Sequence, residues 1–158
     1  MKKKVYWLAL LFFIVDLISK QIVVNVIDLH ETIQIIPNFF YLTYVQNKGA
    51  AFSILENQQI LILLVTGITL FFINKFLNNE NINKFEMISY SIITGGILGN
   101  LFDRVVFGYV IDFFDFRFGK YHYPVFNIAD CFIVVGVIIL VVYTIIEGRK
   151  NGNKSRRK

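Results

Sequence analysis

The sequence predicts a mostly helical membrane protein with four transmembrane helices, a small β-rich external part and an aromatic interfacial loop. Of the 158 residues, 56% are hydrophobic and 17% are charged, and the mean hydropathy is +0.59. Soluble domains are apolar at roughly 45–50% and charged at about 25%. Several stretches without charge approach the length of about 20 residues that a helix needs to cross a bilayer. The composition therefore excludes a soluble or a disordered chain.

Four spans account for these stretches, and we expect them to form one integral-membrane domain over residues 1–158, with spans at about 5–27, 57–75, 85–106 and 127–146. The last three spans carry charge only near their ends, whereas the first contains Asp16 and Lys20. The chain begins like a signal peptide, with a basic and then an apolar stretch. No small-residue cleavage site follows, so we expect an uncleaved first helix.

Lysine and arginine predict the orientation of these spans. They cluster at residues 2–4 and in the tail at 147–158, and they border the loop at 76–84. Cytoplasmic loops carry such an excess, so both termini are predicted to be cytoplasmic. The basic tail is expected to meet anionic lipid headgroups. Nucleic-acid binding is not expected, because no folded basic face accompanies the tail.

Two external segments remain, 28–56 and 107–126. The first is rich in β-branched and aromatic residues with a proline and a glycine as breaks, which predicts short strands on the membrane surface. The second is aromatic with scattered charge, which is typical of an interfacial belt. A second hypothesis for this segment is a lid with hinges at Gly108 and Gly119.

Polar side chains gather at the outer ends of the third and fourth spans. Ionisable residues within a span are functional candidates, because a charge at the bilayer centre costs about 2.5–3.5 kcal/mol. Asn100, Asp103 and Arg104 are three and four residues apart, so they share one helix face. Asn127 and Asp130 share a face at the start of the fourth span. We therefore expect a polar site where the two spans end.

The candidate chemistry of this site is a pair of carboxylates, Asp112 and Asp130. Two carboxylates held close together share a proton, so that one acts as a base toward water and the other as an acid. Such a pair is sufficient for peptide-bond hydrolysis without a metal. From the residues alone, structural ion pairing with Arg104 or Lys20 is an alternative role for these aspartates.

Other polar residues receive structural interpretations. Asp16 and Lys20, four residues apart, either neutralise each other within the first span or belong to the site. Asp115 is interpreted as a solvated interfacial charge, and Cys131 as apolar filler. The two histidines belong to no serine or cysteine motif, and no metal-ligand spacing occurs. No metal or other cofactor is expected.

Five motifs in order resemble the signal peptidase II family of bacterial membrane aspartyl proteases, which process lipoproteins. They are Asp16–Lys20 (DLISK), Asn47–Phe52 (NKGAAF), Gly95–Arg104 (GGILGNLFDR), Val110–Phe113 (VIDF) and Phe126–Asp130 (FNIAD). Each motif alone is weak, but five in order at suitable spacing are specific, and the resemblance extends over nearly the whole chain.

The resemblance implies four transmembrane helices, a β-rich external cradle and a site facing outward from the bacterial cytoplasmic membrane. It implies cleavage of the signal peptide from a prolipoprotein, just before a cysteine that carries diacylglycerol. By motif match, Asp112 and Asp130 are the catalytic pair. The supporting positions implied are Asn47, Gly49, Asn100, Arg104, Asn127, Asp16, Lys20 and Asp103. No cofactor is implied, and we expect a monomer.

Two other classes of protein stay open as alternatives. A small ion or proton transporter would carry ionisable residues near the middle of several spans, and here only Asp16 and Lys20 approach that depth. A membrane scaffold subunit would explain glycine packing and aromatic belts. It would not explain three aspartates with amide or guanidinium neighbours on the same helix face.

Overall fold

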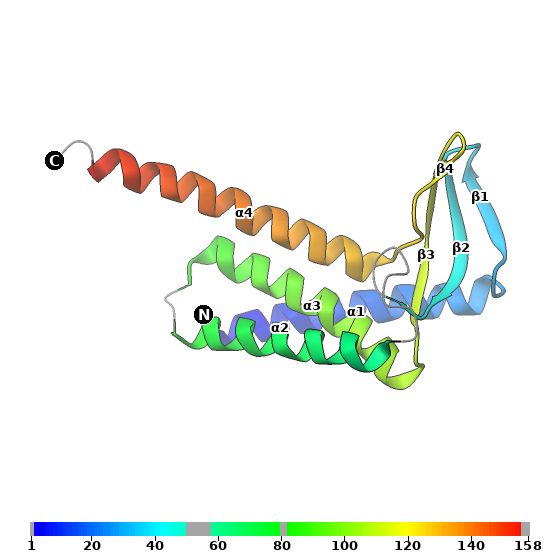
Figure 1. The fold of residues 1–158 in the computed structure, drawn as a ribbon, viewed down its shortest axis with the longest axis horizontal. Coiled ribbons are helices and arrows are strands. Elements are labelled where there is room, and N and C mark those ends of the chain that lie inside the picture. Colours follow the sequence, from blue (N-terminus) through cyan, green and yellow to red (C-terminus); the bar gives the residue numbers. More distant parts are fainter. Residues whose placement is uncertain (1, 50–57, 80–81, 156–158) are drawn as a thin grey trace.

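The computed structural model describes residues 2–49, 58–79 and 82–155 (Figure 1). Their elements are α1 (Lys2–Val26), β1 (Thr32–Ile36), β2 (Phe40–Asn47), α2 (Gln59–Asn79), α3 (Lys84–Val106), β3 (Val110–Phe118), β4 (Tyr121–His122) and α4 (Ile128–Ser155). The helices run side by side, and the strands form a sheet across one end of them (Figure 1). The start of α1 and the end of α4 lie at the opposite end. Residues 50–52 of the predicted second motif lie outside the described residues.

Three of the helices are long and apolar enough to cross a membrane, over Lys3–Val26, Gln59–Asn78 and Ile128–Arg149. They agree with three of the predicted spans. By length and composition α3 does not join them, because it carries many polar residues and glycines. It packs against both α1 and α4 and turns these residues toward its neighbours rather than toward lipid. That α3 is a fourth span stays a prediction.

Close packing of α3 depends on its glycines. A Cβ on Gly95 would come too close to the carbonyl oxygen of Ala9 in α1, and one on Gly96 would meet the carbonyl oxygen of Ala129 in α4. A Cβ on Gly99 would overlap the carboxylate of Asp16. These glycines form a small-residue surface that permits close helix packing and brings polar groups of three helices into contact.

The sheet is antiparallel with the strand order β1-β2-β3-β4. The short strands predicted in the first external segment are confirmed. The second segment differs from the predicted loop, because most of it forms β3 and β4. Pairing with β2 satisfies its backbone groups, and its aromatic rings stack across the sheet, as Phe40 and Phe116 do with ring centroids 4.7 Å apart.

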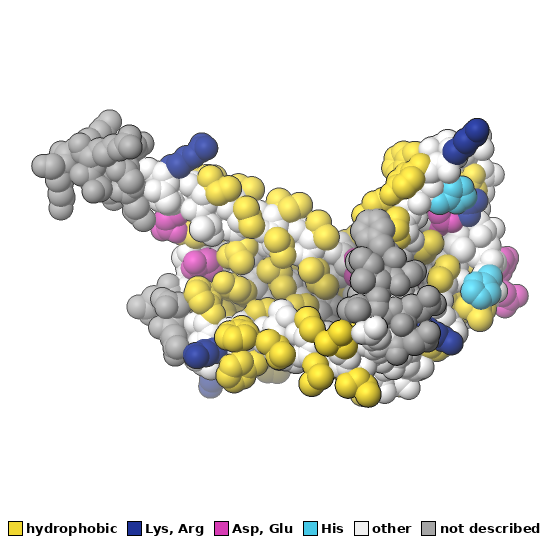
Figure 2. Space-filling model, viewed as in Figure 1, with side chains coloured by type: hydrophobic (Ala, Val, Ile, Leu, Met, Phe, Trp, Pro, Cys, Tyr) yellow, Lys and Arg dark blue, Asp and Glu magenta, His cyan; other side chains and the backbone are white. Residues whose placement is uncertain are grey.

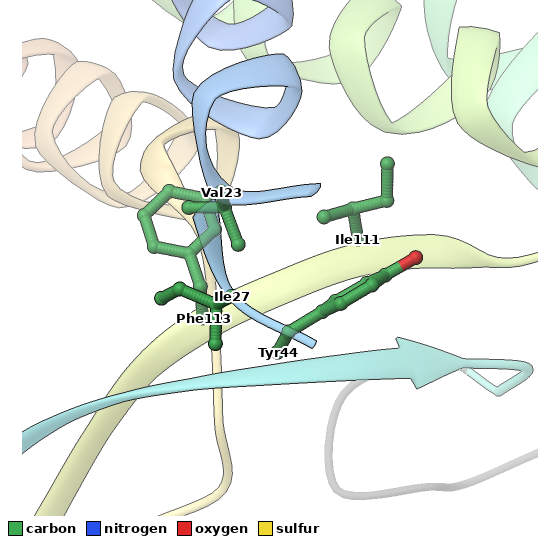
Figure 3. Close-up of a cluster of buried hydrophobic side chains, with 5 residues drawn as sticks. All are labelled: Val23, Ile27, Tyr44, Ile111 and Phe113. Carbon is green, nitrogen blue, oxygen red and sulfur yellow. The ribbon is translucent and has the colours of Figure 1, made fainter. Parts of the chain in front are cut away.

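An apolar cluster attaches the sheet to the end of α1 (Figure 3). It consists of Val23 from α1, Ile27 directly after this helix, Tyr44 from β2, and Ile111 and Phe113 from β3. Successive side chains of a strand point to opposite faces. The residue between Ile111 and Phe113 therefore points away from this cluster, and that residue is Asp112.

Candidate active site

Asp112 and Asp130 come together through Asn127, a fully buried residue just before α4. Its side-chain amide donates to Oδ1 of Asp112 at 2.7 Å. Its main-chain N–H donates to Oδ2 of Asp130 at 3.2 Å, and its Oδ1 accepts from the N–H of Asp130 at 3.0 Å. This reciprocal pattern is a capping box, so the same local signal that begins α4 also positions one carboxylate.

Two further asparagines hold the remaining carboxylate oxygens. Asn47, at the end of β2, donates to Oδ2 of Asp112 at 2.9 Å. Asn100, on α3, donates to Oδ1 of Asp130 at 2.8 Å. Each of the four carboxylate oxygens therefore accepts a hydrogen bond from a neutral amide. Among the described residues neither aspartate forms an ion pair, which favours the acid–base pair over structural ion pairing.

The pKa of Asp112 reflects this environment. Burial, and after it the charge of Asp130, raise the pKa of this carboxyl from its ordinary value of 3.8 to about 7, although hydrogen bonds from Asn47 and Asn127 oppose the rise. Asp112 is 2% exposed. A carboxyl that keeps its proton near neutral pH beside a second carboxylate can serve as an acid while the second serves as a base.

Arg104 connects the last turn of α3 to the end of β2. Its guanidinium donates to the carbonyl oxygen of Gly49 at 3.1 Å and to that of Asn100 at 3.2 Å. The N–H of Gly49 in turn donates to Oδ1 of Asn47 at 2.9 Å. Arg104 thus holds the chain segment that carries Asn47, and its own charge stays beside the two aspartates.

Asp16, Lys20 and Asp103 form an ionic cluster behind the aspartates. Nζ of Lys20 lies 2.7 Å from Asp16 and 2.9 Å from Asp103, and it donates to Oδ1 of Asn100 at 3.0 Å. All three charged side chains are buried. The pairing of Asp16 with Lys20, one of the two predicted roles, is present, and Asn100 connects that pair to Asp130.

A cavity of about 1070 Å³ opens in front of the aspartates. Both aspartates line it, together with aromatic side chains of the sheet and apolar side chains of α4, namely Phe116, Phe118, Tyr123, Phe126, Ile133, Val134 and Val135. Figure 2 shows the surface hollowed between α4 and the sheet, with hydrophobic side chains on both walls. No sequence pattern distinguishes these lining residues, because similar apolar residues occur throughout the chain.

Asp115 contradicts its prediction as a solvated charge. It is 4% exposed, accepts from Thr43 at 2.9 Å and pairs with Arg117 at 2.5 Å. Burial opposes its ionisation, but the hydrogen bonds from Arg117 and Thr43 outweigh that effect and lower its pKa. The prediction is wrong because it did not include the pairing of β3 with β2, which places Thr43 beside it. Cys131 is half-buried and lines the cavity.

All of the predicted site residues meet in one network, and its remaining partners are backbone groups that no side-chain pattern reveals. Within the described part of the chain, no group of three or more histidine, cysteine, aspartate or glutamate side chains could hold a metal ion. The arrangement offers two carboxylates with a shared amide, an adjacent arginine and an apolar cavity.

Comparison with known proteins gives a consistent result. The family described as "Signal peptidase (SPase) II" matches residues 8–146. The lipoprotein signal peptidase of Haemophilus ducreyi is 43% identical over 152 residues, which cover 93% of this chain and 94% of the relative. That of Pasteurella multocida is 43% identical over 141 residues, covering 86% and 85%. A solved structure described as a bacterial membrane enzyme matches with a TM-score of 0.83 at 30% identity, covering 91% of this chain and 88% of that one. These similarities favour a protease over a transporter or a scaffold subunit.

Proposed function

The chain belongs to the signal peptidase II family, and from this membership we propose that it cleaves diacylglyceryl-modified prolipoproteins just before the lipidated cysteine, with Asp112 and Asp130 as the catalytic pair. It is a bacterial membrane protease that removes signal peptides from prolipoproteins. The observation that carries the assignment of the pair is the shared contact with Asn127 at the head of an apolar cavity.

The reaction follows from the protonation of the two carboxyls. Asp130, as the carboxylate, takes a proton from water while the water oxygen attacks the scissile carbonyl. Asp112, as the acid, donates its proton to the carbonyl oxygen, which gives a tetrahedral gem-diol. The proton on Asp130 then passes to the departing cysteine nitrogen as the C–N bond breaks. One hydroxyl of the gem-diol returns its proton to Asp112 as the carboxyl group of the product forms, so both aspartates regain their starting protonation. No covalent intermediate and no metal ion takes part.

Neighbouring groups stabilise this sequence. The asparagines orient both carboxylates, and the positive charge of Arg104 lies where negative charge develops. Its hydrogen bonds to Gly49 and Asn100 hold that guanidinium at the rim of the cavity. The network is therefore organised before substrate arrives, and little of the binding energy is needed to assemble it.

The apolar part of the cavity receives the lipid portion of the substrate. Ile133, Val134 and Val135 of α4 continue the cavity from Asp130 along the helix. A diacylglyceryl group lying against this face of α4 holds the cysteine at the depth of the two aspartates. Binding of the lipid thereby offsets the entropic cost of orienting the scissile peptide bond.

The site faces outward and both termini are cytoplasmic in this proposal. The sheet and the start of α4 lie at one end of the helices, and the lysine-rich start of α1 lies at the other (Figure 1). Asp112 belongs to β3 of that sheet, and Asp130 to the first turn of α4. The positive-inside rule assigns the lysine-rich end to the cytoplasm. We expect a monomer, because one chain supplies both aspartates and the donors to all four of their oxygens.

Incubation of the purified protein with a lipidated and an unlipidated prolipoprotein tests the function. Cleavage of the lipidated form alone is the expected result. Equal cleavage of both forms would contradict the substrate proposed. Asp112→Asn and Asp130→Asn should each abolish cleavage in a folded protein, whereas Cys131→Ala should retain it. Near-normal turnover in Asp130→Asn, with loss in Cys131→Ala, would contradict the aspartyl mechanism.

A further inference from the structure

Two main-chain hydrogen bonds connect the ionic cluster to the chain segments that carry the aspartates. Oδ2 of Asp103 accepts from the N–H of Ile111 at 3.1 Å, and Ile111 directly precedes Asp112. Oδ1 of Asp16 accepts from the N–H of Ala129 at 2.9 Å, and Ala129 directly precedes Asp130. The same contact therefore occurs twice, once on β3 and once in the first turn of α4.

Lys20 joins the two contacts. Its ammonium lies 2.7 Å from Asp16 and 2.9 Å from Asp103. One cation therefore holds both carboxylates, each of which supports one half of the site. Lys20 and Asp103 are each 1% exposed, and Asp16 is 0% exposed. Water therefore competes little for these bonds, and the separation between the two supported main-chain segments depends on a compact ionic group shared by α1 and α3.

We propose that Asp16, Lys20 and Asp103 are positioning residues that set the separation of the two catalytic carboxyls through the N–H groups of Ile111 and Ala129. The inference rests on the proposed function, since it takes Asp112 and Asp130 as the reacting pair. The pair shares a proton only while its carboxyls stay close, and a displacement of about 1 Å can cost about 10²-fold in rate.

Stability alone is a weak reason for this cluster. Buried ionic groups are often no more stabilising than well-packed apolar residues of similar volume, because burying the charges is costly. A cluster that served only stability would have no need to place an acceptor on the residue before each aspartate. The absence of a side chain at Gly99 makes the room for the Asp16 carboxylate. The packing of α3 on α1 is therefore adapted to the contact with Ala129.

Asp103 offers the sharpest test, because one of its oxygens serves both the N–H and Lys20. Asp103→Asn keeps an acceptor for the N–H of Ile111 at nearly unchanged size, while Asp103→Leu removes it. We expect Asp103→Leu to lower kcat for the lipidated prolipoprotein by about 10²-fold with little change in KM. We expect Asp103→Asn to recover most of the lost kcat.

Asp16→Leu should lower kcat as Asp103→Leu does, because it removes the acceptor for the N–H of Ala129. Asp28→Leu, at an exposed external position, is the matched control and should keep the wild-type kcat.

Thermal unfolding of each purified variant separates rate from folding. The positioning role is wrong if folded Asp103→Leu keeps the wild-type kcat, or if Asp103→Asn loses as much as Asp103→Leu. Should Asp103→Leu fail to fold, folded Asp16→Leu takes its place: a loss of about 10²-fold in kcat supports positioning, and a wild-type kcat overturns it. Failure of the proposed function looks different, because wild-type protein would then leave the lipidated prolipoprotein intact, or Asp112→Asn would still cleave it.

Discussion

Raising the pH above neutrality should remove the proton from Asp112 and stop cleavage. The pKa of this carboxyl is raised to about 7, mainly by burial and then by the charge of Asp130. About one molecule in ten keeps this proton at pH 8, and about one in a hundred at pH 9. Because kcat/KM reports the ionisation of the free enzyme, it should fall about tenfold per pH unit above pH 7.

The same ionisation predicts the direction of a stability change. Unfolded Asp112 ionises near 3.8 and the folded residue near 7, so the folded protein binds one more proton between these values. Stability therefore falls as the pH rises through this window, by about 1.4 kcal/mol per pH unit and about 4 kcal/mol in all from this group. Thermal unfolding of the purified protein across the window measures it, with Asp112→Asn as the variant that should lose the dependence.

Asn47→Leu assigns the alkaline limb of the activity profile to Asp112. The Asn47 amide lowers the pKa of Asp112 by donating to its carboxylate, so removal of the amide should move the limb to higher pH. Asp115→Asn, on the same strand as Asp112, should leave the pH of this limb unchanged. The assay is kcat/KM for the lipidated prolipoprotein from about pH 5 to about pH 9. A flat profile above pH 7, or a limb that moves to lower pH in Asn47→Leu, would refute the assignment.

Three further predictions concern packing and topology. Gly96→Ala should lower stability by about 1–3 kcal/mol in thermal unfolding, because the added Cβ meets the α4 backbone; an unchanged midpoint would contradict the close α3–α4 contact. Asp115→Asn should lower the unfolding temperature while kcat stays near wild type, since it weakens the contact with Arg117 away from the cavity; loss of kcat at an unchanged unfolding temperature would place Asp115 in the reaction. In a Cys131→Ala background, an impermeant thiol reagent on intact cells should label Lys120→Cys and not Glu80→Cys; the reverse pattern would invert the proposed topology.

Local sequence information was sufficient for the helices and for most of the candidate site. Hydropathy and length indicated α1, α2 and α4, because lipid contact imposes apolar residues along a whole helix. The spacing of Asn127 and Asp130 indicated a shared face at a helix start, which the capping box confirms. The motifs that resemble signal peptidase II brought the rest of the site together, and the comparisons confirm the family.

Tertiary structure alone decided which charges are exposed and what they contact. Asp112 and Asp115 lie three residues apart in one aromatic stretch, and no local pattern distinguishes their surroundings. Strand pairing buries both, gives Asp115 an arginine, and leaves Asp112 with neutral amides beside Asp130. The sequence likewise does not determine which carboxylates pair with Lys20. Packing of α1 against α3 places Asp16 and Asp103 beside its ammonium group. The pKa of Asp112 follows from these long-range contacts and from burial, and neither is a property of the residues next to it in the chain.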